Sequence, residues 1–270
     1  MQSSYALLLA VLLAGGLAAS AHAQKAVGLR AGATLSSYRM TGDLDESFDG
    51  GSGIGYYAEL DFNLPLGTSG VSLLPLVGVN IQQTATFTTE AEASLAAFPF
   101  PVIAIDDARD EMTSLAVAAL FRYRIPGKSV TPYFEAGPYA KFNLSGTHFA
   151  EGEVLGFISD SEVAYSSFDE EEEIEFGTSS SDVYKPSNFT FAFGAGLMAD
   201  LEFGTLSIGA RYIGIGNVRG PESEGGPGGL VEQGLFQDGS VGVAEYGDSD
   251  KLRLRTLELT VGFAIPLGGY

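Results

Sequence analysis

Eight stretches of the chain alternate apolar and polar residues with a period of two, as β-strands do when their two faces meet different environments. They cover residues 27–38, 54–64, 71–87, 114–124, 130–142, 189–203, 206–212 and 257–265. In the clearest stretch, Phe189, Phe191 and Phe193 share one face and Thr190 lies on the other. Segments of about ten such residues are typical of transmembrane β-barrels. The pattern predicts a closed, all-β, antiparallel barrel of eight strands, with ten strands as the alternative.

A soluble β-sandwich or lipocalin-like barrel would show the same alternation, but with the charged face turned to water. The polar face of the eight stretches holds five basic and six acidic residues: Arg30, Arg122, Arg124, Lys141 and Arg211, with Glu59, Asp61, Glu135, Asp200, Glu202 and Glu258. Such near-neutral pairing suits a narrow lumen, because an unpaired buried charge is costly. The charge pattern favours a membrane barrel whose lumen contains these eleven residues.

The lumen charges have two interpretations. They could line a narrow conducting path, or they could form a salt-bridge network that plugs the barrel. Eight strands leave room for little more than side chains, which favours the plug. We therefore expect a non-enzymatic protein with a structural or surface-interaction role. A narrow channel or small-solute uptake protein is the second hypothesis, and a barrel enzyme acting on lipid or peptide is the third.

The connections between the stretches alternate short and long. Residues 67–70, 126–129 and 204–205 form tight links, whereas 39–53, 89–112, 145–188 and 217–250 are long. The long connections contain 4, 6, 11 and 7 acidic residues, which are all the acidic residues outside the stretches. Outer-membrane barrels have short periplasmic turns and long extracellular loops. The pattern predicts an acidic extracellular face.

The N-terminus has the features of a secretory signal peptide. An apolar run from Ala6 to Ala19 precedes Ala21-His22-Ala23, a small-x-small cleavage site. We expect residues 1–23 to be removed and residues 24–270 to form the barrel domain. No later apolar run reaches the 18 residues of a transmembrane helix. The predicted location is the outer membrane of a Gram-negative-type bacterium, with membrane lipid as the surrounding partner.

Composition narrows the chemistry further. The 270 residues include 34 acidic and 14 basic ones, a formal charge of −20, which argues against binding nucleic acid. With no cysteine, disulfides, thiolate nucleophiles and Cys-ligated zinc are excluded. No cofactor is expected, and no protein partner can be named. Five lysines in so acidic a chain are a pattern that we associate with life in high salt.

Three segments are candidate sites. The densest acidic run, Asp169, Glu170, Glu171, Glu172 and Glu173, could bind Ca²⁺ or another hard cation, although a solvated, mobile loop is favoured; Asp43–Asp49 is a weaker cation candidate. His148, beside Ser145 and Glu151, is the one histidine of the mature chain and the sole candidate for a catalytic triad, but no Gly-x-Ser-x-Gly element accompanies it. The apolar segment Leu95–Ile105 fits either a docking element or an extension of the neighbouring strands.

The motifs Gly28-Leu-Arg-Ala-Gly-Ala-Thr-Leu-Ser and Ile54-Gly-Tyr-Tyr-Ala-Glu-Leu lie in the first and second stretches. The former is similar to the first strand of the PorT-family outer-membrane β-barrel domain, and the latter to the second hairpin of that family. Pro132-Tyr-Phe-Glu-Ala-Gly-Pro-Tyr and Leu206-Ser-Ile-Gly-Ala-Arg-Tyr resemble later strands. The resemblance extends over nearly the whole mature chain and implies an eight-stranded barrel without shared catalytic residues. The long acidic third and fourth loops and the C-terminal Pro266-Leu-Gly-Gly-Tyr270 depart from the family pattern.

Overall fold

The computed structural model describes residues 25–41, 49–50, 52–68, 70–93, 102–125, 129–159, 162–174, 176, 184–218 and 251–267. The predicted signal peptide, residues 43–48 of the weaker cation candidate and residues 95–101 of the apolar segment lie outside these ranges. Among the described residues, no helix has the length and apolar character needed to cross a membrane.

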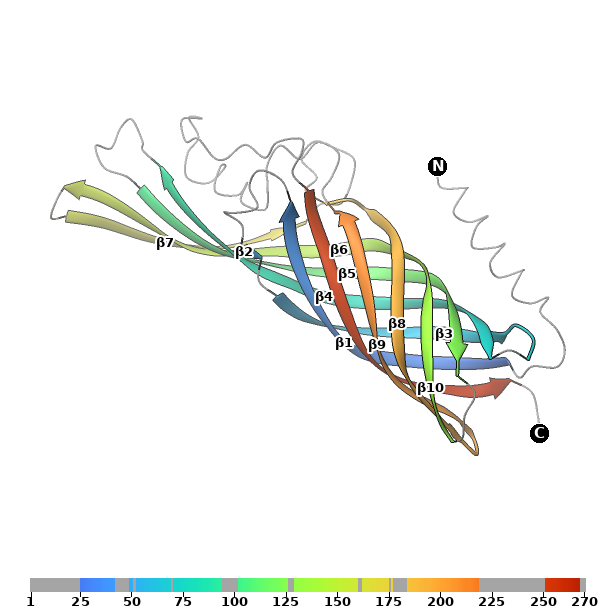
Figure 1. The fold of residues 1–270 in the computed structure, drawn as a ribbon. Helices are drawn as coiled ribbons and strands as arrows, with labels where there is room; N and C mark the ends of the chain where they lie inside the picture. Colours follow the sequence, from blue (N-terminus) through green and yellow to red (C-terminus); the bar gives the residue numbers. More distant parts are fainter. Residues whose placement is uncertain are drawn as a thin grey trace.

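Eight strands close into an antiparallel ring, which confirms the predicted fold class (Figure 1). The ring strands are β1 (Lys25–Thr41), β3 (Ser52–Pro65), β4 (Val71–Ala93), β5 (Val102–Arg124), β6 (Val130–Ser159), β8 (Ser187–Leu201), β9 (Gly204–Asn217) and β10 (Lys251–Leu267). Each strand pairs with the next in this order, and β10 pairs with β1 from Lys25↔Leu267 to Thr41↔Lys251. Closure leaves the barrel wall without a free edge, as a lipid environment requires.

Two further strands explain why ten strands was a reasonable alternative. β2 (Asp49–Gly50) pairs only with β4, and β7 (Glu162–Glu173) pairs only with β6. Neither enters the closed ring. Both lie in segments that the alternation predicts as loops. The prediction is wrong for them, because backbone pairing with β4 and β6 forms these strands without the long alternating pattern of the ring strands.

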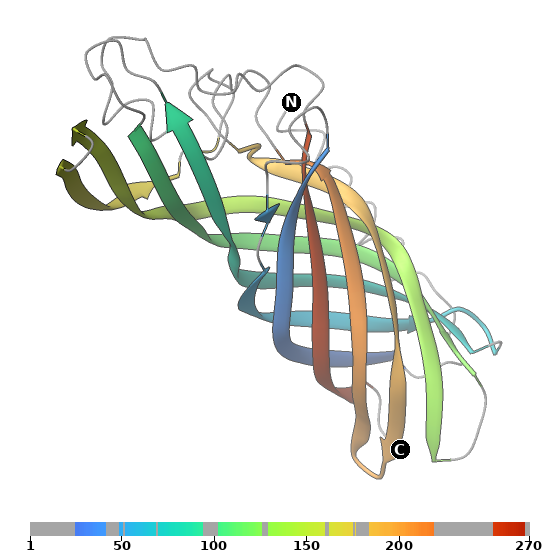
Figure 2. The ribbon, with the colours of Figure 1, turned by 60° about the vertical axis from the view of Figure 1, so that its left-hand side comes forward.

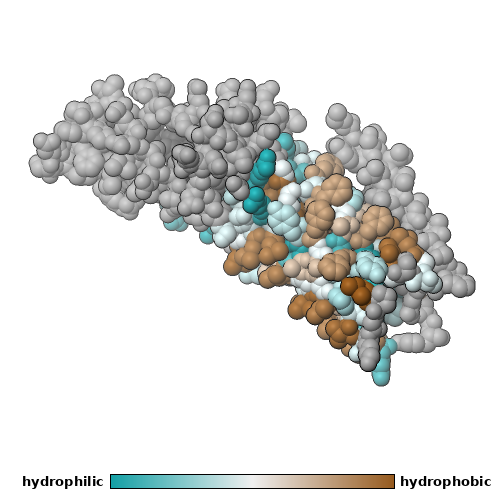
Figure 3. Space-filling model, in the orientation of Figure 1, coloured by the Kyte–Doolittle hydropathy of each residue, from teal (hydrophilic) through white to brown (hydrophobic). Residues whose placement is uncertain are grey.

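The two faces of the ring strands differ in the way that the alternation predicts. Large apolar side chains point outward; Phe193, Ile208 and Val261, for example, are each more than half exposed. Figure 3 shows hydrophobic residues gathered on the outer surface of the barrel strands. The inward face buries charged and polar side chains, among them Arg211 and Glu258. An apolar exterior around a polar interior is the arrangement of a transmembrane barrel.

The interior also contains apolar and aromatic side chains that the alternation did not assign. Leu74 and Leu120 are fully buried and belong to one cluster with Tyr139 and Ile213. Glycines make room for the larger rings: a Cβ on Gly209 would lie 2.3 Å from the Tyr133 hydroxyl. Side chains therefore fill the middle of the lumen.

The two ends of the barrel differ. At one end, here called the turn end, β3 connects to β4, β5 to β6 and β8 to β9 over a few residues. Gly67 and Gly70 have φ values of 74° and 78° in the first of these turns, a conformation that glycine adopts without strain. The opposite end, here called the loop end, holds the long connections.

A four-stranded sheet extends from the loop end beyond the ring (Figure 2). The β3–β4 ladder ends at Tyr56↔Ile81 and the β6–β8 ladder at Phe142↔Ser187, whereas β4, β5, β6 and β7 continue to pair with one another. We call residues 84–93, 102–110 and 148–159 together with β7 the protruding sheet. It replaces much of the two predicted loops at 89–112 and 145–188, and residues 102–105 of the apolar segment are part of β5.

Candidate functional site

The charged lumen is built from three arginine–glutamate pairs on neighbouring strands. The strand register places Arg30 (β1) opposite Glu59 (β3), Arg122 (β5) opposite Glu135 (β6), and Arg211 (β9) opposite Glu258 (β10). Arg30 Nε lies 2.9 Å from Glu59 Oε1, Arg122 Nη2 donates to Glu135 Oε2 at 2.7 Å, and Arg211 Nε donates to Glu258 Oε2 at 2.6 Å. Because directly opposite side chains in a sheet are neighbours, register alone forms these pairs.

Further ion pairs cross the lumen and join the three pairs into one network. Arg30 Nη1 donates to Glu135 Oε1 at 3.1 Å, although β1 and β6 are four strands apart in an eight-stranded ring and so lie on opposite walls. Arg211 Nη2 donates to Glu59 Oε2 at 2.6 Å between β9 and β3. Asp61 accepts from Arg30 Nε at 2.9 Å. Side chains from opposite walls therefore meet in the middle of the barrel.

Every member of this network is buried, with at most 5% of the residue exposed. The buried charges around this network are Arg30, Arg122, Arg211 and Lys141 against Glu59, Asp61, Glu135 and Glu258, so these eight residues are neutral together. Lys141 donates to Gln82, whose amide donates in turn to Thr256 at 3.0 Å. Paired and hydrogen-bonded charges are the form in which a low-dielectric interior tolerates ions.

Aromatic rings pack beside the arginines. The Arg122 guanidinium carbon lies 4.6 Å from the centre of the Tyr133 ring, and that of Arg211 lies 5.8 Å from Tyr57 and 5.9 Å from Tyr139. Asn80 donates to the Tyr139 hydroxyl at 3.1 Å. The rings fill the space between the charges and hold the guanidinium groups in place by cation–π attraction.

The remaining three residues predicted for the lumen network lie at its turn end. Arg124 forms an ion pair with Asp200, and Thr205 donates to Asp200 at 3.1 Å. These side chains are partly exposed, 30% for Arg124 and 51% for Asp200. Glu202 is an exposed residue of the β8–β9 turn rather than a residue of the lumen, which corrects its assignment. The polar alternation of β8 continues past the last residue of the strand, so the alternation does not show where the strand ends.

A second polar cluster closes the loop end of the barrel. Asp110 (β5) is fully buried, and His148 Nδ1 (β6) lies 2.6 Å from Asp110 Oδ1. The Tyr184 hydroxyl donates to Asp110, and the Tyr38 hydroxyl lies 3.5 Å from it. The Tyr38 and Tyr184 rings stack with centroids 6.2 Å apart. Burial, with Asp110 as the next largest cause, raises the pKa of Tyr184 well above its usual range.

Sequence reasoning missed this cluster because it placed Asp110 and Tyr184 in long loops. The only signal for Asp110 was its spacing. It lies an even number of residues from Ser114 and Arg122, so its side chain belongs to the same inward face of β5. Tyr184 lies outside the strands and had no such signal.

The structure does not assemble the triad considered for His148. Ser145 and Glu151 are exposed, whereas His148 is buried against Asp110. Residues 145 and 151 alternate with 148 along β6, so their side chains leave the opposite face of the strand. Nothing in this geometry supports nucleophilic catalysis by Ser145.

The acidic run considered for cations lies in β7 rather than in a mobile loop. Asp169, Glu171 and Glu173 are exposed and pair across the ladder with Glu151, Phe149 and Thr147. Alternate residues of a strand lie about 6.6 Å apart, so the exposed carboxylates of Asp169, Glu171 and Glu173 are spread along β7 and do not converge on one point. Among the described residues, no group of three or more acidic, His or Cys side chains is arranged to hold a metal ion.

A closed eight-stranded barrel with an apolar exterior and an ion-paired lumen is the architecture of outer-membrane β-barrel proteins. Comparison with protein families agrees: residues 22–218 match the family described as outer membrane protein beta-barrel domain. The chain belongs to this family. The match includes every ring strand except β10. No curated protein sequence matches the chain.

Solved structures of similar proteins have low sequence identity to this chain. Neisserial surface protein A matches over 90% of this chain and 99% of its own, with 10% identity and a TM-score of 0.37. Ail, the attachment invasion locus protein of Yersinia pestis, matches over 90% and 100%, with 11% identity and a TM-score of 0.34. The N-terminal β-barrel domain of Pseudomonas aeruginosa OprF matches over 89% and 97%, with 12% identity and a TM-score of 0.28.

Proposed function

We propose that this protein is a non-enzymatic surface protein of the outer membrane that contacts a cationic partner through the protruding sheet. The observation that carries the proposal is the continuation of four strands beyond the ring. β6 alone has 30 residues, roughly 100 Å of strand, whereas crossing a bilayer takes about 9–11 residues. Short turns face the periplasm in such barrels, so the protruding sheet lies outside the cell.

The charge of the protruding sheet defines the partner. It contains thirteen acidic residues, two in β4, three in β5, two in β6 and six in β7, against one basic residue, Arg109. Arg109 lies in an exposed pair with Glu111 and 4.7 Å from the centre of the Phe149 ring. Among the described residues, β7 pairs only with β6, so its outer edge can accept a further extended segment. Like charge disfavours a second copy there, and a cationic segment is complementary.

The other two hypotheses have less support. A channel needs a continuous aqueous path, whereas ion pairs between opposite walls occupy the lumen. The triad considered for an enzyme is not assembled, because Ser145 points away from His148. The proposal includes three further points: residence in a Gram-negative-type outer membrane, loops adapted to high salt, and membership of the PorT group within the barrel family. The acidic composition and the strand motifs given above support them.

The test compares two triple variants that remove the same charge. Asp169→Asn, Glu171→Gln and Glu173→Gln neutralise the exposed face of β7, whereas Asp43→Asn, Asp45→Asn and Glu46→Gln neutralise three residues of the β1–β3 connection. Refolded protein in lipid nanodiscs is titrated with a fluorescent lysine decapeptide. Three exposed ion pairs are worth about 1.5 kcal/mol together, so the β7 variant should bind about tenfold more weakly.

The control variant should bind within roughly twofold of the parent, because charges outside β7 act on the peptide mainly through screened, long-range attraction. Equal loss in both variants would show that only net charge matters and would contradict a docking role for β7. Stable single-channel openings in a planar bilayer would instead favour the channel.

A further inference from the structure

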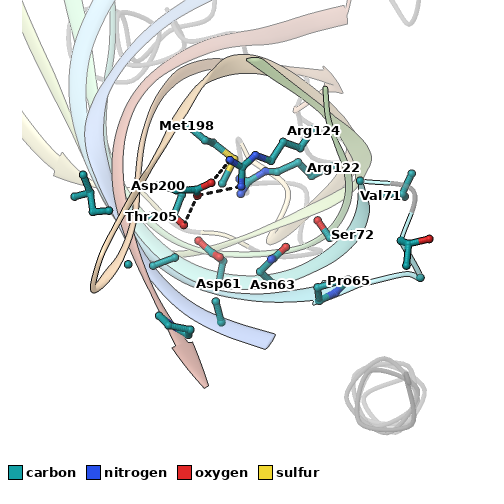
Figure 4. Close-up of a pocket in the computed structure, with 18 of the residues that line it drawn as sticks. Asp61, Asn63, Pro65, Val71, Ser72, Arg122, Arg124, Met198, Asp200 and Thr205 are labelled. Carbon is teal, nitrogen blue, oxygen red and sulfur yellow. Dashed lines mark hydrogen bonds and ion pairs between the residues drawn. The ribbon is translucent and has the colours of Figure 1, made fainter. Parts of the chain in front are cut away.

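A cavity of about 470 Å³ lies at the turn end of the barrel, on the side away from the protruding sheet (Figure 4). Its mouth is formed by the β3–β4 turn with Gly67 and Thr68 and by the β8–β9 turn with Glu202. Its inner wall includes Asp61 and Arg122, two members of the ion-paired network. The cavity therefore borders the network.

The cavity walls separate positive from negative groups. Figure 4 shows Arg122 and Arg124 extending into the cavity from one side, with Asp61 and Asn63 along the opposite wall. Asp200 lies at the mouth, where it accepts from Arg124 at 3.1 Å. Ser72 (β4) lies directly opposite Arg122 (β5) in the ladder, so these two donors are neighbours.

Several groups on these walls retain hydrogen-bonding capacity. Arg122 uses Nε and Nη2 on Glu135, which leaves Nη1 available to a ligand. Asp61 accepts from Arg30 through Oδ2 only, and Oδ1 accepts from no other described residue. Asn63 Oδ1 is buried and accepts no hydrogen bond within the described part of the chain. One wall thus offers donors from Arg122 and Ser72, and the other offers acceptors from Asp61 and Asn63.

We propose that this cavity is a binding site for a small zwitterion of the amino-acid or short-peptide class. The carboxylate of the ligand meets Arg122 Nη1 and Ser72, and its ammonium group meets Asp61 Oδ1 and Asn63 Oδ1. Guanidinium is the side chain best suited to a carboxylate. The volume lies within the range of about 300–1,000 Å³ that small-molecule sites occupy.

The distribution of charge excludes other classes of ligand. An anion would face Asp61, Asp200 and Glu202, and a cation would face Arg122 and Arg124. An apolar ligand would desolvate charged groups without replacing their hydrogen bonds, which is costly. Of the charged and apolar classes, a ligand with both charges is the one that satisfies both walls, so selectivity arises from repulsion of singly charged analogues as well as from attraction.

The experiment uses the full mature chain refolded in detergent micelles and three probes of nearly equal size. The dipeptide Ala-Ala has both charges, N-acetyl-Ala-Ala has only the negative one and Ala-Ala amide only the positive one. Isothermal titration calorimetry should show Ala-Ala binding about tenfold more tightly than either analogue, because each analogue leaves one wall of buried polar groups unpaired. Binding of the acetylated probe as tight as that of Ala-Ala would overturn the proposal, and so would no binding of any probe.

Two variants place the binding at this cavity. Asn63→Leu removes an acceptor without touching the ion-paired network and should weaken Ala-Ala binding about tenfold. Asn188→Leu changes a buried asparagine of β8 that does not line the cavity, and should leave the affinity within roughly twofold. If Asn63→Leu does not fold, as judged by circular dichroism, Ser72→Ala gives the same test from the donor wall. Equal affinity in the cavity variant and the control would contradict the assignment. Neither outcome bears on the protruding sheet, which lies at the other end.

Discussion

Replacing Arg211 with Leu should be among the most damaging single substitutions in the lumen. Arg211 is 1% exposed and donates to Glu258 at 2.6 Å and to Glu59 at 3.2 and 2.6 Å. Its loss leaves Glu258, which is fully buried, without a cationic partner in the described structure. Glu59 keeps Arg30, whose Nε lies 2.9 Å away.

The magnitude follows from one unpaired buried carboxylate. Removing one partner of a buried ion pair costs about 3–5 kcal/mol, because the remaining charge stays out of water. Replacing both partners with apolar residues of similar volume is often neutral. The double variant Arg211→Leu/Glu258→Leu should therefore be more stable than Arg211→Leu alone, by roughly 2 kcal/mol or more.

The exposed pair Arg124–Asp200 is the matched control. Its side chains are 30% and 51% exposed, so Asp200→Leu should lower the free energy of unfolding by at most about 1 kcal/mol. Urea unfolding in lipid vesicles measures all three variants. Far-ultraviolet circular dichroism is the suitable signal, because the chain has no tryptophan.

Two results would refute this reasoning. Suppose that Arg211→Leu unfolds at the same urea concentration as the parent, with an unchanged slope of unfolding free energy against urea concentration. The lumen is then hydrated, and Glu258 is in contact with water. If the double variant Arg211→Leu/Glu258→Leu is no more stable than Arg211→Leu alone, Arg211 and Glu258 do not act as a pair.

Three further outcomes are expected. Mass spectrometry of membrane-extracted protein should find Gln24 at the N-terminus; retention of Met1 would exclude cleavage after Ala23. The raised pKa of Tyr184 means that its neutral form stabilises the loop-end cluster below about pH 10, and that this stability is lost as the pH rises through the folded-state pKa. Tyr184→Phe should therefore reduce the loss of the cluster's stability at alkaline pH. Tyrosine absorbance measures the titration, and a titration curve that the substitution leaves unchanged would contradict this prediction. A Glu-specific protease should cleave β7 slowly at both low and molar salt, because β7 is hydrogen-bonded to β6; rapid cleavage that slows with salt would mean that it behaves as a loop.

The faces of the ring strands could be read from the sequence. In a strand, the direction of each side chain is fixed by the local backbone, so the alternation around Phe193 and Ile208 identifies the outward face without knowledge of any partner. The balance of charge on the other face then distinguishes a lumen from a water-facing surface. The alternation gives a wrong prediction where the polar pattern continues beyond the end of the strand, as at Glu202, which lies in the turn after β8.

The tertiary structure decided which groups meet. Register sets the pair Arg122–Glu135, but only closure of the ring brings Arg30 to Glu135 from the opposite wall. The extension of β5 and β6 into the protruding sheet depended on pairing between acidic segments, where sequence charge suggested loops. Burial of Asp110 beneath Tyr184 joins residues 74 positions apart. Strand faces are a property of each residue and its neighbours, whereas these contacts depend on the closure, tilt and length of strands that are distant in the sequence.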